Sequence, residues 1–295
     1  MKKIHNKISE KLMILSIIMS MFLFGGYYEF TSCIVAIVLI ITFLIKVKEN
    51  KKIQIRVTDI NIFIIIFSFA YLVSILYAVD KGMAFLGFLK FSVLLIFIIT
   101  LMQFESGEVK DIQRCIPYIA ASMTIITFIL FFIPYTKGIV ASENNRIGGM
   151  FQYANTFALF LLVAIIQILS KGIYRKKELT MLMILVLGIL FSQSRITLIL
   201  LILSIIVLII KNKISKKNIK YLLITLFISI VSVIVFKLNR IINISIFDST
   251  LIGRIIYYKD AINLVITHPF GLRIYGVLLS RANYPNSSIY NKICS

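Results

Sequence analysis

Long apolar segments recur along most of this chain, and they limit its fold more than any other feature. A helix needs about 20 apolar residues to cross the hydrocarbon core of a bilayer, which is about 30 Å thick. Nine segments of spanning or near-spanning length can be marked, at residues 11–28, 30–47, 58–79, 84–103, 116–134, 150–170, 179–192, 196–210 and 221–236. They do not alternate with a period of two, which excludes a transmembrane β-barrel. The sequence therefore predicts an all-α, polytopic helical membrane protein with about nine transmembrane helices.

One apolar run, from Leu179 to Ile210, is interrupted by Ser192-Gln-Ser-Arg195. As a single helix it would be about 48 Å long and would need a tilt of about 50°, beyond the usual limit of about 40°. We therefore expect a hairpin of two short helices, with Arg195 at its outer turn. A charged Arg at a helix centre costs about 2.5–3.5 kcal/mol on insertion and is a candidate functional residue, although an Arg can also simply extend to the interface.

The positions of Lys and Arg predict the orientation. Twenty of them lie within residues 1–11, 46–56, 104–114, 171–177 and 211–220, and five lie on the alternate side, at Lys81, Lys90, Lys137, Arg146 and Arg195. Because Lys and Arg favour the cytoplasmic loops, the N-terminus is expected in the cytoplasm and everything after Phe236 outside it. The inner loops are read as short basic connectors without chemistry.

The third outer loop carries further polar residues, in Arg146-Ile-Gly-Gly-Met-Phe-Gln-Tyr-Ala-Asn155. Gln152 and Asn155 are three residues apart, a helical spacing, near the outer surface. They can cap a helix or join helices by hydrogen bonds. Alternatively, Arg146, Gln152 and Asn155 line the same outer cavity as Arg195.

The chain changes character after residue 236. From Asp248 or Ser249, apolar residues recur at helical spacing on one stripe, through Leu251, Ile255, Tyr258, Ile262 and Val265. The pattern predicts an amphipathic helix over about 249–267, on the outer face, with Arg254 near its N-terminal end. The chain thus divides into a transmembrane bundle, 1–236, and an extracytoplasmic segment, 237–295.

Several classes of function are disfavoured by composition. The net charge of +20 is spread between apolar runs instead of forming one face, which argues against nucleic acid as a partner. The three Cys residues have no metal or disulfide spacing, and no metal or cofactor site is expected. We expect membrane lipid to surround the apolar helices as a partner of the protein.

Four motifs occur in an order that resembles the O-antigen ligase/polymerase-like membrane protein family. They are Arg146-Ile-Gly-Gly-Met-Phe-Gln-Tyr-Ala-Asn155, Ser192-Gln-Ser-Arg195, Gly253-Arg254-Ile-Ile-Tyr-Tyr and His268-Pro-Phe-Gly-Leu272. The resemblance covers about residues 58–272. It implies a metal-independent glycosyltransferase of the GT-C type in the bacterial cytoplasmic membrane. Such a protein transfers or polymerises a glycan from an undecaprenyl-diphosphate carrier on the extracytoplasmic face. By the same resemblance, Arg195 and Arg254 hold the diphosphate.

The sequence departs from the family pattern after Leu272. The family continues with a His-Asn segment whose His acts as the base, and neither His5 nor His268 matches it, so no catalytic residue is assigned. An AT-rich back-translation with one base deleted near Leu272 restores a family-like continuation. We therefore expect a frameshifted, truncated and inactive chain. The alternatives are a transporter or flippase for a lipid-linked or anionic solute, and a membrane scaffold.

Overall fold

The computed structural model describes residues 8–26, 28–56, 58–78, 80–142, 146–171, 176–211 and 249–267, and the single positions 227 and 231. Most of these residues are helical. The long helices are α1 (Ile8–Phe22), α2 (Glu29–Asn50), α3 (Asp59–Ser74), α4 (Lys81–Met102), α5 (Ser106–Phe132), α7 (Ala154–Lys171), α8 (Lys176–Ser192), α9 (Arg195–Ile210) and α12 (Ser249–Thr267). Short elements join α5 to α7 and α1 to α2: η1 (Phe24–Gly26), α6 (Lys137–Val140), β1 (Ala141–Ser142), β2 (Arg146–Ile147) and η3 (Gly149–Phe151).

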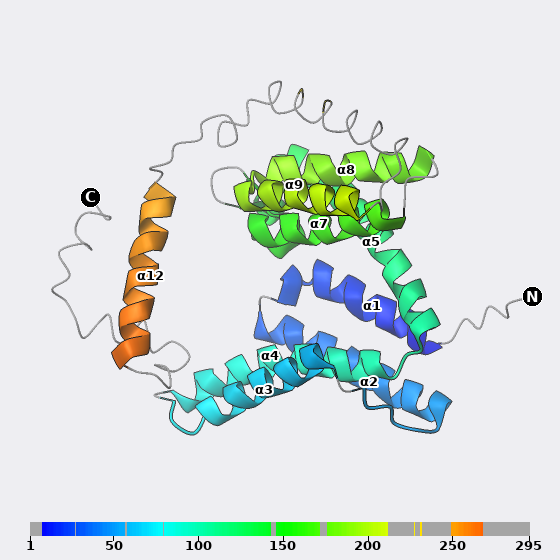
Figure 1. The fold of residues 1–295 in the computed structure, drawn as a ribbon, viewed down its shortest axis with the longest axis vertical. Coiled ribbons are helices and arrows are strands. Elements are labelled where there is room, and N and C mark those ends of the chain that lie inside the picture. The colour runs from blue at the N-terminus through cyan, green and yellow to red at the C-terminus, as the bar shows by residue number, and fades with distance from the viewer. Residues whose placement is uncertain are drawn as a thin grey trace, which may run out of the picture.

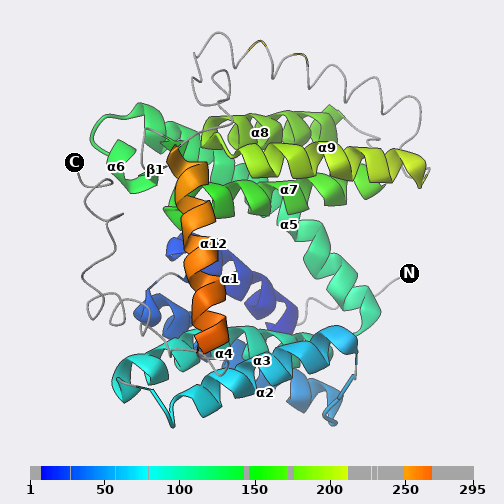
Figure 2. The same cartoon turned by 60° about the vertical axis from the view of Figure 1, so that its left-hand side comes forward.

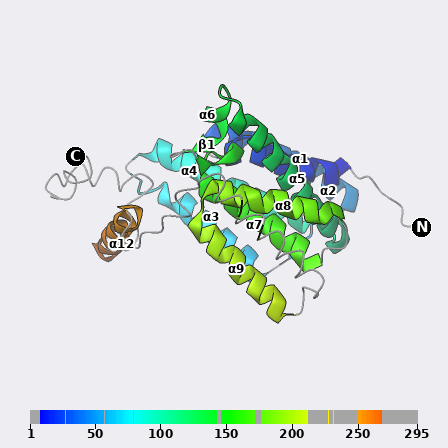
Figure 3. The same ribbon diagram turned by 90° about the horizontal axis from the view of Figure 1, so that it is seen from above.

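The helices form two layers (Figure 1). One layer contains α7, α8 and α9, and the other contains α2, α3 and α4, with α1 between them. Helix α5 crosses from one layer to the other. Seen from above, α9 diverges from α8 after the turn that joins them (Figure 3).

The largest apolar core lies where α5, α7 and α8 meet. Phe157, Leu161, Leu185 and Ile189 are fully buried there. Gly188 allows the close approach, because a Cβ at this position would lie 2.5 Å from Leu161 Cδ1 and 2.9 Å from Thr124 Cγ2. Small residues at helix contacts are typical of membrane bundles.

Several helices expose apolar side chains on their outer faces, such as Ile66 and Phe69 on α3 and Ile199 and Ile202 on α9, each more than half exposed. Four of the described helices, α2, α4, α5 and α7, are long and apolar enough to cross a membrane. Both features agree with the predicted all-α membrane fold.

The first eight predicted apolar segments coincide with helices, and the hairpin of α8 and α9 is confirmed. The ninth, 221–236, lies outside the described residues apart from positions 227 and 231. One expectation was wrong in part: of residues 104–114, read as a basic inner connector, residues 106–114 form the start of α5. A capping box stabilises this start, since Glu105 and Glu108 each bond the backbone of the other.

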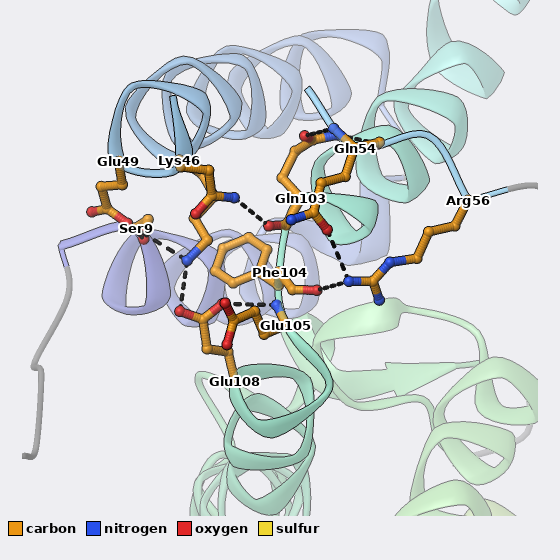
Figure 4. Close-up of polar contacts among 10 residues, drawn as sticks. Ser9, Lys46, Glu49, Gln54, Arg56, Gln103, Phe104, Glu105 and Glu108 are labelled. Atoms are coloured by element: carbon orange, nitrogen blue, oxygen red, sulfur yellow. Dashed lines mark hydrogen bonds and ion pairs between the residues drawn. The ribbon is translucent and has the colours of Figure 1, made fainter. Parts of the chain in front are cut away.

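A polar network lies at the end of the bundle where α2 ends and α5 begins (Figure 4). Lys46 Nζ donates to Glu108 Oε1 at 2.6 Å and lies 4.8 Å from the centre of the Phe104 ring. Gln103 Nε2 donates to the Gln54 carbonyl, and Arg56 Nη2 donates to the Phe104 carbonyl. These bonds join α2 and the segment after it to the α4–α5 junction.

Helix α12 spans Ser249–Thr267, the bounds predicted from its apolar stripe. It lies across the ends of the other helices and not along them (Figures 1 and 2). Ile255, Tyr258 and Ile262 of the stripe are each 59–67% exposed. The side chains of Leu251 and Val265 lie outside the described residues, and the division into two segments at residue 236 stays a prediction.

Candidate functional site

The turn between α8 and α9 places Arg195. Gln193 adopts a left-handed conformation, φ 52°, which reverses the chain within two residues. Ser194 N donates to Ser192 Oγ at 3.3 Å, and the hydroxyls of Ser194 and Thr197 lie 2.9 Å apart. All three hydroxyl residues are buried, whereas Arg195, the first residue of α9, is only partly buried. The turn is therefore buried and closed by hydrogen bonds between its hydroxyl residues. Arg195 lies at the less buried edge of this turn.

A short β-hairpin lies against this turn. Strands β1 and β2 pair antiparallel, with Ala141 opposite Ile147 and Ser142 opposite Arg146. From β2, Arg146 Nε donates to the Ser192 carbonyl at 2.9 Å, and its Nη2 donates to Asn155 Oδ1, also at 2.9 Å. Asn155 Nδ2 in turn donates to the Tyr153 hydroxyl at 3.2 Å. Arg146 thus joins three elements: the hairpin, the end of α8 and the start of α7.

Two glycines in the same loop lie where a larger residue would clash with its surroundings. Gly149 has φ +58°, and a Cβ there would lie 2.8 Å from the Phe157 ring. A Cβ at Gly148 would lie 2.9 Å from the backbone carbon of Gln152. The loop can therefore fold onto the start of α7 in this way only with glycine at these two positions.

The predicted site residues have different outcomes. The structure brings Arg146 and Asn155 together with the turn that carries Arg195. Gln152 is exposed and left-handed, and it closes η3 through its backbone. Arg254 lies on α12, but its side chain is outside the described residues. The cavity predicted for these residues stays a prediction.

The sequence reading missed the partners that complete the network. These are the Ser192 carbonyl, the Tyr153 hydroxyl and Thr197. Tyr153 stands inside a motif that had been singled out, so its position carried a signal. The Ser192 carbonyl had no signal in the sequence. A backbone carbonyl at the end of a helix can be identified as a partner only once the position of the turn is known.

The chemistry of this end of the bundle suits an anion. Guanidinium groups bind phosphate through paired, charge-assisted hydrogen bonds. Arg195 lies three residues after Ser192, whose carbonyl accepts the hydrogen bond from Arg146. Among the described residues, no group of three or more His, Cys, Asp or Glu side chains could hold a metal ion.

The antiparallel apolar helices define the class of this protein as a multi-pass helical membrane protein. The comparison with protein families then narrows it: the model described as Wzy_C, O-antigen ligase, matches residues 180–292. The match confirms the predicted resemblance to the O-antigen ligase-like family and supports a ligase or polymerase type of function, with a lipid-linked substrate, in a bacterial membrane. Comparison with curated proteins and with solved structures gives no match.

The matched residues include α8, the turn with Arg195, α9 and α12 with Arg254. Arg146 and Asn155 precede the match, and the structure connects them to it through the Ser192 carbonyl. The match also extends past Leu272 into the tail, where a departure from the family was expected. The frameshift stays a prediction.

Proposed function

We propose that this chain binds an undecaprenyl-diphosphate-linked glycan at the extracytoplasmic face of the membrane, in the site of a glycan ligase or polymerase for cell-surface polysaccharide. The observation that supports this most directly is the position of Arg195. It stands at the rim of a buried polar turn, within the residues that match the O-antigen ligase family.

The proposed orientation has the N-terminus in the cytoplasm. Arg195 lies at one end of the bundle. The C-terminal end of α2 and the N-terminal end of α8, each with Lys residues, lie at the other, because successive helices run in opposite directions (Figure 1). If Lys and Arg keep those helix ends in the cytoplasm, the turn meets the outer leaflet.

Arg195 and Arg254 are proposed to hold the two phosphates of the carrier. The glycan leaves the carrier as a new glycosidic bond forms to an acceptor hydroxyl, and the carrier departs as a diphosphate. Fixed guanidinium groups stabilise the charge that develops on this leaving group. Helix α12 supports the assignment, since its N-terminal end lies level with the layer of α7, α8 and α9 in Figures 1 and 2.

Binding and transfer are separate steps in this proposal. Transfer also needs a base for the acceptor hydroxyl, a role worth about 10²–10⁴-fold in rate. The resemblance assigns that base to a His in a His-Asn segment, which neither His5 nor His268 matches. The proposal for this chain therefore concerns carrier binding, which can be tested by itself.

Carrier binding by the purified chain in nanodiscs tests the proposal. Undecaprenyl diphosphate is the probe, and Arg195→Ala is compared with Arg114→Ala, an exposed Arg on α5 paired with Asp111. Losing a hydrogen bond to a charged group costs about 1.5–3 kcal/mol, so Arg195→Ala should weaken binding about 10- to 100-fold and Arg114→Ala should leave it unchanged. Equal affinity in all three proteins would overturn the proposal.

A further inference from the structure

Arg146 is bound by its neighbours in a way that suggests a role different from that of Arg195. Two of its N–H groups are already engaged, by the Ser192 carbonyl and by Asn155 Oδ1, each at 2.9 Å. Both acceptors belong to the protein: Ser192 is fully buried and Asn155 is partly buried. An Arg whose guanidinium already donates hydrogen bonds to two protein atoms is better suited to stabilising the structure than to binding a ligand.

The atom that Arg146 contacts on α8 controls the turn. Ser192 is the last residue of α8, so its carbonyl is one of those that a helix leaves without an internal partner. A cation at this end also interacts favourably with the helix dipole. The next residue, Gln193, is left-handed, and Arg195 follows two residues later. The direction in which Arg195 leaves the bundle therefore depends on how the Ser192 carbonyl is fixed.

We propose that Arg146 is a positioning residue for Arg195. It fixes the α8–α9 turn from the β-hairpin, and Asn155 orients its guanidinium. The inference rests on the proposed function for its consequence, which is that carrier affinity depends on Arg146 and Asn155 without either touching the carrier.

Charge-preserving substitutions separate positioning from direct binding. Arg146→Lys keeps the positive charge, but an ammonium group lacks the planar fork that reaches two acceptors. Asn155→Leu removes the acceptor at similar size without changing charge, whereas Asn155→Asp keeps an acceptor oxygen for the guanidinium.

The first experiment does not depend on the carrier. A spin label is attached at Arg195→Cys after Cys33, Cys115 and Cys294 are replaced by Ala, and its mobility is measured by electron paramagnetic resonance in nanodiscs. We expect the label to be restricted when Arg146 and Asn155 are both present. It should be more mobile with Arg146→Lys or Asn155→Leu, and it should stay restricted with Asn155→Asp. Equal mobility in all of them would overturn the inference, whatever the function.

The second experiment measures the affinity for undecaprenyl diphosphate with Arg195 intact. Arg146→Lys and Asn155→Leu should each weaken binding about tenfold, the effect of roughly one lost charge-assisted bond. The double variant should be no weaker than either, because both remove one arrangement. Additive losses, or full affinity with Asn155→Leu, would count against positioning. If Arg195→Ala binds normally while the label still responds to Arg146, the proposed function fails and the positioning role stands.

Discussion

Gly149 is the residue at which the outer loop depends most on a missing side chain. Its φ of +58° is left-handed, and the Phe157 ring occupies the space where a Cβ would be. Phe157 is fully buried in the main core. One residue thus connects the loop that carries Arg146 to the packing of α7.

Gly149→Ala should lower the stability of the bundle by more than about 1 kcal/mol, because Ala is strained at this φ and clashes with Phe157. The matched control is Gly107→Ala on α5, where nothing lies within 4 Å of a new Cβ. That variant should be neutral or stabilise by up to about 1 kcal/mol.

Apparent thermal midpoints of both proteins in detergent, followed by circular dichroism, provide the comparison. A Gly149→Ala midpoint equal to or above that of Gly107→Ala would show that the loop can move away from Phe157.

At the scale of whole elements, the junction of α2 with α5 depends on a buried ion pair. Lys46 is 0% exposed and Glu108 only 12%, and their charged atoms are 2.6 Å apart, with Glu49 a further carboxylate at 3.6 Å. Glu108 also takes part in the capping box that starts α5. The same carboxylate therefore begins one helix and holds the end of another.

Lys46→Met should destabilise the bundle by about 3–5 kcal/mol, because it leaves a largely buried carboxylate without its closest partner. Adding Glu108→Gln should recover much of that loss, since it removes the carboxylate charge that Lys46 balances in the native chain. Arg114→Met, which breaks an exposed pair with Asp111, should cost no more than about 1 kcal/mol. Thermal midpoints of the four proteins give the answer, and a double variant less stable than Lys46→Met would contradict the explanation.

The α8–α9 hairpin could be predicted from the sequence, whereas the ion pair at the α2–α5 junction could not. Apolar periodicity and one charged break were enough to predict the α8–α9 hairpin, because the membrane fixes the length of a span. Lys46 was counted with the Lys and Arg residues of a basic inner connector. Its pairing could not be predicted, because its partner Glu108 is 62 residues away and nothing local indicates it. For the same reason Arg146 and Asn155 could be assigned to one region, but their bond to each other could not be foreseen.

Helix α12 is an element whose exposed apolar stripe predicts contact with the outer leaflet. The chain contains no Trp, so a single introduced Trp is a clean reporter. In vesicles containing brominated lipid, fluorescence from Ile262→Trp should be quenched, and fluorescence from Asp260→Trp, off the stripe, should be quenched much less. Equal quenching at the two positions would mean that the stripe does not face lipid.

At the scale of the whole molecule, the described polar networks gather at the two ends of the bundle. One contains Arg146, Ser192 and Asn155, and the other contains Lys46 and Glu108. The proposed orientation assigns the first end to the outside of the cell and the second to the cytoplasm.

Gln193→Cys and Lys52→Cys test this orientation in a chain without its native Cys residues. An impermeant thiol reagent added to intact spheroplasts should label Gln193→Cys, and it should label Lys52→Cys only after the membrane is opened. The reverse pattern would invert the topology and remove the extracytoplasmic site.

Helices α8 and α9 have 17 and 16 residues, or about 24–26 Å of helix. They are shorter than the hydrocarbon layer around them, so the bilayer must thin locally or the turn must sink. Lipids with longer acyl chains would draw Ser192 and Arg195 further below the head groups. The acyl chain length of the host membrane would then help to decide whether this guanidinium meets a phosphate at all.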